Sequence, residues 1–152
     1  MVLTYIGIGS NLGDPLANVM QAIDLMAQAG SIVARSSYYR TKAWGVVDQP
    51  DFCNAVVQLN TNLPPQELLV AMQSIEKTMG RTPTYHWGPR IIDLDILIYG
   101  DLRLSDPELI IPHPGLYERA TVLVPLAEIA AAYSDARDRL SKQSLDDVRL
   151  MS

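Results

Sequence analysis

Apolar and polar residues follow one another in short blocks that predict strands and helices in turn. An apolar, β-prone run covers Val2 to Ile8, and a loop composition follows it from Gly9 to Gly13. Asp14 and Pro15 predict the start of a helix, because Asp suits the N-cap and proline suits the first helical position. Apolar residues then recur at helical spacing up to Gly30, which is placed to end the helix: Leu16, Val19, Met20, Ile23, Met26 and Ala27.

The middle of the chain predicts two more strands. The second strand runs from about Ser31 to Arg40, with Ile32 and Ala34 on one face, and a loop from Thr41 to Asp51 follows it. The third strand, from about Phe52 to Thr61, alternates clearly, since successive side chains of a strand point to opposite faces. One of its faces carries the apolar residues Cys53, Ala55, Val57 and Leu59.

A second helix is predicted from Pro64-Pro65 to Gly80, with a loop from Arg81 to Arg90 after it. The fourth strand runs from Ile91 to Tyr99, and a third helical stretch covers about Leu116 to Ala132. The polar residues beyond Asp135 receive no assignment.

The predicted order is therefore β-α-β-β-α-β followed by a helical segment. That order is typical of the α+β ferredoxin-like fold, a four-stranded antiparallel sheet with both helices packed on one face. With 152 residues, no internal repeat and no linker, we expect residues 1–152 to form a single domain.

Composition narrows the function classes. With 48% apolar and 19% charged residues the chain can bury a core, and its net charge of −5 disfavours a protein that holds long nucleic acids by a global positive field. A local basic pocket remains compatible with that average. The single Cys53 cannot form an internal disulfide, no apolar run approaches the ~18 residues of a membrane span, and no basic leader is readable. We therefore expect a soluble, cytoplasmic protein.

The fourth strand carries the strongest chemical signal. Asp93 and Asp95 project to the same face of the strand, and the apolar residues between and around them project to the other: Ile92, Leu94, Ile96 and Ile98. Two neighbouring carboxylates suit Mg²⁺, a hard cation that keeps waters and recruits substrate phosphates. A solvated polar face is the alternative, although the apolar flanks place this strand in the core sheet, where unpaired acids are costly.

Basic and aromatic residues precede this acidic pair. Arg81 and Arg90 flank a loop that also holds His86 and Trp87, and guanidinium groups bind phosphate oxygens bidentately. A polyphosphate cradle and a pair of surface ion pairs are both compatible with this segment. Trp87 could be a packing residue or an aromatic side chain that lies against a flat ligand. His113, bracketed by Pro112 and Pro114, is either a structural residue or a catalytic one held in a fixed position.

Nucleotide-binding glycine motifs are absent. Gly7, Gly9 and Gly13 join a strand to a helix, but their spacing does not match G-x-G-x-x-G, and no phosphate-binding G-x-x-x-x-G-K-[ST] segment exists. We interpret these glycines as positions of close backbone approach, with a small ligand near Asn11 as one use.

The segment Trp87-Gly88-Pro89-Arg90-Ile91-Ile92-Asp93-Leu94-Asp95-Ile96-Leu97 resembles the signature of the 6-hydroxymethyl-7,8-dihydropterin pyrophosphokinases, enzymes of folate biosynthesis. The resemblance extends over nearly the whole chain. It includes residues 5–13, residues 48–54, Gln73 to Glu76 with Gly80-Arg81, and Ile111 to Pro114 with Arg119 and Pro125-Leu126.

The resemblance implies the ferredoxin-like fold and an enzyme that transfers the pyrophosphoryl group of ATP to the hydroxymethyl oxygen of the pterin, releasing AMP. It implies two Mg²⁺ ions held by Asp93 and Asp95, and catalytic roles for these two residues with Arg81, Arg90 and Arg119. The implied ATP site comprises Gln73, Glu76, Arg81, Trp87, Arg90, Ile96, His113 and Arg119. The implied pterin site comprises Gly9, Thr41, Trp44, Phe52, Asn54 and Asp93. Its partners would be these two small molecules, with no nucleic acid and no membrane. We expect a monomer, with a homodimer as the alternative.

Three departures from the family pattern bear on this expectation. Thr121 stands where the family usually has an aromatic residue, His86 stands where it usually has arginine, and Thr82-Pro83-Thr84 lacks a further arginine. Thr121 and His86 motivate one alternative function, a catalytically weak paralogue that binds ATP or a pterin without efficient transfer. An RNA-recognition module on the same fold has little support, because the central strands lack exposed aromatic pairs that would stack bases.

Overall fold

The computed structural model describes residues 1–42, 49–81 and 89–151. Trp44, Thr82-Pro83-Thr84, His86 and Trp87 lie outside the described residues. The elements, in chain order, are β1 Val2–Ser10, α1 Pro15–Leu25, β2 Ser31–Arg35, β3 Tyr39–Thr41, β4 Phe52–Thr61, α2 Pro65–Thr78, β5 Asp93–Tyr99, β6 Leu104–Ser105, β7 Ile110–Ile111, α3 Ala120–Ile129, α4 Ser134–Asp138, α5 Lys142–Asp146 and β8 Val148–Leu150.

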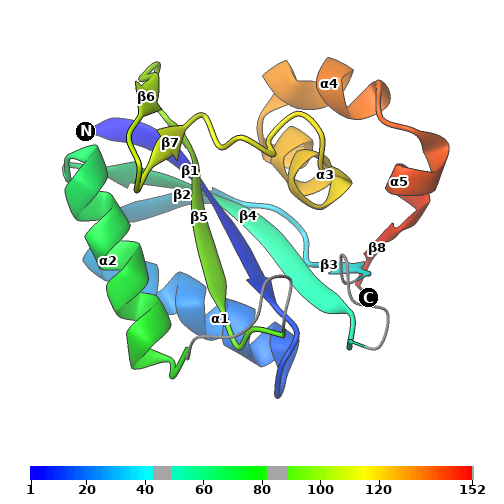
Figure 1. Cartoon of the computed structure of the whole chain (residues 1–152), viewed down its shortest axis with the longest axis horizontal. Coiled ribbons are helices and arrows are strands. Elements are labelled where there is room, and N and C mark those ends of the chain that lie inside the picture. The colour runs from blue at the N-terminus through cyan, green and yellow to red at the C-terminus, as the bar shows by residue number, and fades with distance from the viewer. Residues whose placement is uncertain (43–48, 82–88, 152) are drawn as a thin grey trace.

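One antiparallel sheet organises the molecule (Figure 1). Its strands run in the order β5-β1-β4, after which both β2 and β3 pair with β4, and β8 pairs with β3. This arrangement confirms the predicted α+β class and the β-α-β-β-α-β connectivity. The sheet is wider than predicted because β8 adds a strand at its edge.

The predicted second strand is two strands, and Ser36 is the reason. Its backbone N–H donates to Val56 C=O while its Oγ accepts from Val56 N–H, so Ser36 stays attached to β4. The next backbone N–H, that of Ser37, donates instead to the Glu128 carboxylate on α3. Side chains that take over backbone donors in this way interrupt a strand ladder.

Helices cover both faces of the sheet (Figure 1). As predicted, α1 and α2 share one face, where the larger apolar core includes Ile6, Val57 and Met72. The Asp14 cap is confirmed, since its Oδ1 accepts from Ala17 N–H at 3.2 Å. The third helix begins at Ala120 rather than Leu116 and lies on the other face, over a smaller core.

A bulge between β1 and β5 corrects one sequence expectation. Ile6 pairs with Ile96, but Tyr5 pairs with Ile98, so Leu97 is an extra residue on β5. A bulge of this kind shifts the alternation of side chains along the strand. Ile98 therefore lies on the α3 face with Tyr5, not on the face of Leu94 and Ile96 as the simple alternation predicted.

The polar C-terminal residues are ordered elements. After α3, the chain continues through α4 and α5 and returns to the sheet as β8, which brings the C-terminus beside β3 (Figure 1). A short hairpin, β6–β7, precedes α3 and was also not predicted. Among the described residues, no helix has the length and apolar character needed to cross a membrane.

Candidate active site

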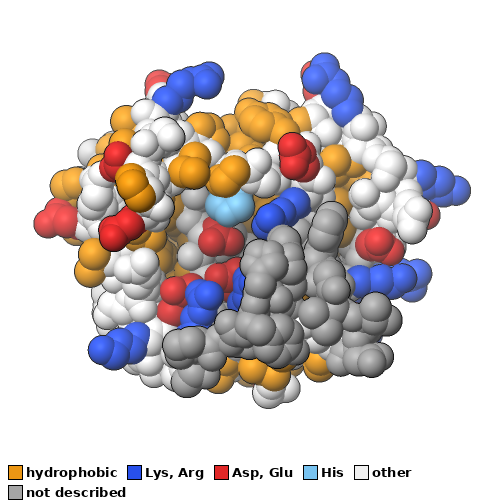
Figure 2. Space-filling model, viewed as in Figure 1, with side chains coloured by type: hydrophobic (Ala, Val, Ile, Leu, Met, Phe, Trp, Pro, Cys, Tyr) orange, Lys and Arg blue, Asp and Glu red, His pale blue; other side chains and the backbone are white. Residues whose placement is uncertain are grey.

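A pocket opens on the α3 face of the sheet, over the ends of β1, β4 and β5. Counted together with the solvent space at its open side it measures about 770 Å³, and the centre of a water molecule can occupy about 100 Å³ of it. Figure 2 shows acidic and basic side chains gathered beside a histidine in the middle of the corresponding face. The pocket is lined by eight of the residues expected from the sequence: Gly9, Thr41, Phe52, Asn54, Arg90, Asp93, Asp95 and Arg119.

Strand register explains why these residues meet. Gly9 on β1 pairs with Asn54 of β4 on one side and with Asp93 of β5 on the other. Directly paired residues of antiparallel strands point to the same face, so Asn54 and Asp93 flank a glycine that carries no side chain. Gly7 likewise has an acidic neighbour, Asp95 of β5, but its partner on the β4 side is the apolar Val56. Gly9 therefore forms the floor between an amide wall and an acidic wall.

The amide wall is held by neutral contacts. Asn54 Nδ2 donates to Thr41 Oγ1 at 2.5 Å, and Thr41 is buried. A Cβ at Gly9 would lie only 2.7 Å from Asn54 Oδ1, so Gly9 leaves the space that this oxygen fills. The amide is thereby fixed with its nitrogen toward Thr41. Within the described part of the chain its other N–H and its oxygen have no further hydrogen-bond partner, and Phe52 adds an aromatic face to the same pocket.

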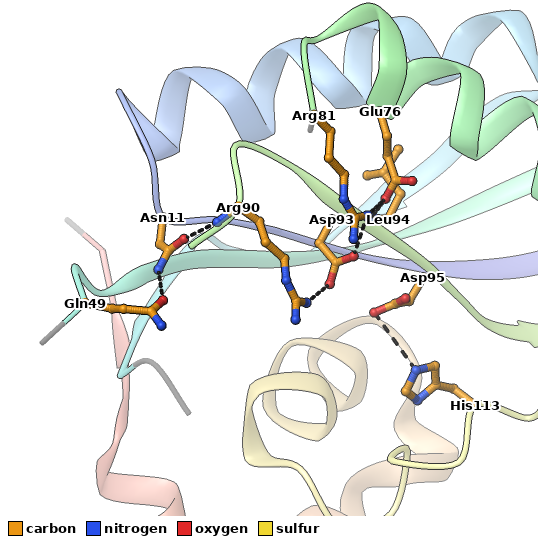
Figure 3. Close-up of polar contacts among 9 residues, drawn as sticks. All are labelled: Asn11, Gln49, Glu76, Arg81, Arg90, Asp93, Leu94, Asp95 and His113. Carbon is orange, nitrogen blue, oxygen red and sulfur yellow. Dashed lines mark hydrogen bonds and ion pairs between the residues drawn. The ribbon is translucent and has the colours of Figure 1, made fainter. Parts of the chain in front are cut away.

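The acidic wall begins with Asp93, which lies between two arginines (Figure 3). Arg81 Nη1 donates to Asp93 Oδ1 at 3.0 Å, and Arg90 Nη1 donates to Asp93 Oδ2 at 2.8 Å. These charge-assisted contacts use both carboxylate oxygens. Asp93 therefore draws both cations toward the pocket.

Glu76 on α2 anchors this cluster from below. Its Oε2 accepts from Leu94 N–H at 2.9 Å and from Arg81 Nη1. Burial raises the pKa of Glu76, although the Leu94 N–H and Arg81 counteract part of that rise. For Arg81, burial lowers the pKa, but the neighbouring Glu76 and Asp93 outweigh it and the net shift is upward. Arg81 thus stays charged, bridging α2 and β5.

Asp95 has a different environment. Its side chain is 43% exposed, against 21% for Asp93, and the Nε2 of His113 lies 4.0 Å from its Oδ2. The surrounding protein removes water from this carboxyl group, and Asp93 and Glu76 repel its negative charge. Loss of hydration is the larger of these effects, and together they raise the pKa of Asp95 from 3.8 to about 7. An ionised Asp95 is therefore a site that favours a cation.

His113 faces Asp95 in a defined tautomer (Figure 3). Gly115 N–H donates to His113 Nδ1 at 3.0 Å, so in the neutral ring the proton lies on Nε2, the nitrogen that points to the pocket. Burial and the nearby Arg119 lower the pKa of His113. At neutral pH the ring consequently presents an uncharged N–H donor.

Asn11 connects the two loops that border the pocket. It is 1% exposed. Its Oδ1 accepts from Arg90 N–H at 2.8 Å, and its own N–H donates to Arg90 C=O at 3.0 Å. Its Nδ2 donates to Gln49 Oε1 at 3.0 Å (Figure 3). The same nitrogen donates to Pro50 C=O at 3.2 Å. One side chain therefore ties the segment before β4 to the segment before β5.

The remaining expected residues occupy other positions. Gln73 is exposed on α2, one turn before Glu76, and Ile96 is buried in the core under the sheet, on the opposite face from Asp95. Trp44 and Trp87 lie outside the described residues. Sequence reasoning did not assign the clamp to Asn11 and did not include Lys42 and Val122, which also line the pocket. Thr121, noted from the sequence as a departure from the family pattern, lines it as well. Asn11 follows a glycine-containing strand end, but its partners are far away in sequence, so no local signal could reveal them.

The comparisons with known proteins decide the family. The model of the 7,8-dihydro-6-hydroxymethylpterin-pyrophosphokinase family matches residues 5–131. The chain belongs to this family. A 2-amino-4-hydroxy-6-hydroxymethyldihydropteridine pyrophosphokinase of Methylorubrum extorquens is 48% identical over 132 residues, covering 86% of this chain and 84% of that protein. The protein of the same name from Bacillus subtilis is 44% identical over 129 residues, covering 84% and 77%.

A solved structure supports the fold independently. The chain resembles a crystal structure titled Plasmodium falciparum HPPK-DHPS wild type with pteroate, with a TM-score of 0.66 at 15% identity. The match covers 84% of this chain and 38% of that longer chain. The chain therefore shares the fold of that part of the solved structure.

Proposed function

We propose that the pocket between β1, β4, β5 and α3 transfers the pyrophosphoryl group of ATP to the hydroxymethyl oxygen of 6-hydroxymethyl-7,8-dihydropterin, releasing AMP. The family assignment supports this reaction. The single observation that carries the assignment to this pocket is the row Asn54–Gly9–Asp93, in which a hydrogen-bonding amide lies across a glycine from an acidic cluster. A flat heterocycle and a polyphosphate can be bound side by side in such a site.

The donor set fits magnesium. Asp93 and Asp95 offer carboxylate oxygens on one face of β5, and the described residues contain no group of three or more His, Cys, Asp or Glu that would enclose a cation with protein ligands alone. Mg²⁺ prefers this situation, in which one or two carboxylates are completed by waters and substrate phosphates. We propose two Mg²⁺ ions at Asp93 and Asp95. When bound, they would neutralise the triphosphate and polarise the phosphorus under attack.

The basic residues would hold the triphosphate. Arg81, Arg90 and Arg119 supply fixed positive charge, and His113 supplies a neutral donor at its Nε2. Because phosphoryl-type transfer depends mainly on positioning and charge stabilisation, these groups would act by orienting oxygens around the reacting phosphorus. Gln73, Glu76, Trp87 and Ile96 complete the proposed ATP site; for Ile96 only backbone groups could reach a ligand, since its side chain is in the core.

The amide wall would bind the pterin. Asn54 would read the hydrogen-bonding edge of the ring, Phe52 would pack on its face, and Gly9, Thr41 and Trp44 would complete the pocket. The hydroxymethyl group would then point toward Asp93. Thr121, which lines the pocket, offers a methyl and a hydroxyl where the family usually places an aromatic ring.

Three further properties belong to this proposal. We propose that residues 1–152 act as one domain, as a monomer or alternatively a homodimer, and in the cytoplasm. The alternative of a weak paralogue that binds without efficient transfer is not favoured by the named relatives.

The test is a product assay of the wild-type protein. ATP, the pterin and Mg²⁺ together should yield AMP and a pterin diphosphate in equal amounts, and omission of the pterin or addition of EDTA should abolish AMP formation. Formation of ADP, or tight binding of both substrates by calorimetry without AMP, would contradict the proposed transfer.

A further inference from the structure

The C-terminal segment reaches the amide wall of the pocket although it lies beyond the family match. That match ends at residue 131, whereas α4, α5 and β8 occupy residues 134–150. Figure 1 shows this segment passing α3 and returning to the sheet at β3. The last described residues therefore contact the strand that carries Thr41.

Strand β3 is held from both sides. It pairs with β4 through Tyr39–Asn54 and Thr41–Phe52, and with β8 through Tyr39–Leu150 and Thr41–Val148. At the end of this ladder Met151 N–H donates to Tyr38 C=O at 2.9 Å. A strand of three residues at a sheet edge has few backbone hydrogen bonds of its own, so edge positions of this kind open readily. β8 removes that edge from β3.

We propose that β8 is a positioning element for pterin binding: by pairing with β3 it fixes Thr41, and Thr41 fixes the Asn54 amide. The proposal rests on the function proposed above for this pocket. The relay is short, because Thr41 Oγ1 accepts directly from Asn54 Nδ2 and Asn54 is the residue facing the ligand. A shift of β3 would release the amide to rotate, and a rotated amide presents its donors and acceptor to the wrong ligand atoms.

The adjacent ion pair is a secondary contact. Lys42, which also lines the pocket, has its Nζ 3.5 Å from Asp147 Oδ1, immediately before β8. Both side chains are exposed, at 74% and 42%, and exposed pairs of this kind contribute little. The strand pairing, not the ion pair, therefore carries the inference, and Asp147→Asn should change pterin binding less than twofold.

The register offers a matched pair of proline variants. N–H groups two residues apart point to the same side of a strand, so the Arg149 N–H faces β3 like that of Met151, and the Leu150 N–H faces away. Arg149→Pro removes a donor from the β3–β8 ladder, whereas Leu150→Pro places proline on the open side, where strands tolerate it.

The experiment measures KM for the pterin and for ATP in the two variants. Arg149→Pro should raise KM for the pterin about tenfold, as expected when one hydrogen-bonded contact is lost, with KM for ATP within about twofold of wild type. Leu150→Pro should leave both values within about twofold. Equal rises in both KM values, or no rise in Arg149→Pro, would overturn the proposal.

A second set keeps the test valid if Arg149→Pro does not fold. Thr41→Val keeps the volume and removes the hydroxyl, and should also raise KM for the pterin about tenfold. Thr41→Ser keeps the hydroxyl and should keep KM for the pterin near the wild-type value. A raised KM for the pterin in Thr41→Ser would overturn the relay. Turnover of the wild-type protein distinguishes failure of the proposed function from failure of this inference. If the proposed function is wrong, the wild-type protein itself forms no AMP.

Discussion

The two walls of the pocket are organised by different forces. The amide wall is neutral, and its Asn54 is held by Thr41 in one orientation. The acidic wall is charged, and Asp93 there holds Arg81 and Arg90, the two arginines for which we propose phosphate binding. Neutral side chains can be oriented before a ligand binds at little cost in free energy. Buried charged side chains need partners of opposite charge, so the arginines and Asp93 pair with one another in the absence of ligands.

Asp93 and Asp95 sharpen this contrast within one strand. Asp93 has two arginine partners, while Asp95 has a histidine at 4.0 Å and a raised pKa. The same face of β5 therefore carries one carboxylate that stabilises the folded protein and one whose charge opposes folding until a cation arrives. Asp95 is a position where function is expected to cost stability.

The largest expected effect follows from removing that charge. Asp95→Asn should lower kcat on the order of 10³-fold, because it removes a metal ligand and its charge stabilisation. In EDTA the same variant should melt at a higher temperature than wild type at pH 8. Because the pKa of Asp95 is raised from 3.8 in the unfolded chain to about 7 in the folded protein, stability is lost as the pH rises between these two values. The difference should therefore shrink toward pH 4 and vanish only below about pH 3, where Asp95 is protonated in both states.

Asp93→Asn is the matched variant for this prediction. It should also abolish AMP formation, but its melting temperature in EDTA should fall, because Arg90 loses its carboxylate partner and Arg81 keeps only Glu76. Equal melting behaviour of the two variants would contradict the difference drawn between the two aspartates.

The next effect concerns the residue that joins the walls. Asn11→Leu should reduce the free energy of unfolding by about 2 kcal/mol, since it leaves Arg90 N–H and Pro50 C=O without their buried partner. Urea denaturation measures this loss. Asn18→Leu removes two hydrogen bonds from the same loop at a half-buried position, where water can replace them, and should cost less. An equal loss of stability in the two variants would contradict the role of Asn11 as the buried connection between the segments before β4 and β5.

A smaller effect should isolate the amide wall. Gly9→Ala places a methyl group 2.7 Å from Asn54 Oδ1 and should raise KM for the pterin about tenfold while leaving the Mg²⁺ dependence unchanged. Gly7→Ala, on the same face of β1, meets Leu97 side-chain atoms at 3.4 Å and beyond, an ordinary contact. Initial rates at varied pterin concentration compare the two variants, and equal effects would show that Asn54 is not the residue displaced.

The sequence predicted most of the fold because its signals were local. The Asp14-Pro15 cap, the helical stripe ending at Gly30 and the alternation of β4 each depend on neighbouring residues. The strand interruption at Ser36 and the reversal at Ile98 depend on residues that are distant in sequence: Val56 and Tyr5 on neighbouring strands and Glu128 on α3. Periodicity alone contains no record of those contacts. β8 was missed for the same reason, because its three residues form a strand only against β3.

The candidate site was predictable to a similar extent. The spacing of Asp93 and Asp95 placed both carboxylates on one face, and the structure keeps them there. The different partners of the two aspartates could not be read from the sequence, because Arg81 and Glu76 come from the end of α2. The clamp made by Asn11 requires loops that are distant in sequence to meet, which only the folded chain shows.

The most direct test of the central claim is a metal count. In the presence of a non-hydrolysable ATP analogue and the pterin, titration with Mn²⁺ followed by electron paramagnetic resonance should show about two bound ions per wild-type chain and at most one per Asp95→Asn chain. Binding of two ions with unchanged affinity by Asp95→Asn would contradict the account, because Asp95 would then not be the carboxylate that awaits a cation.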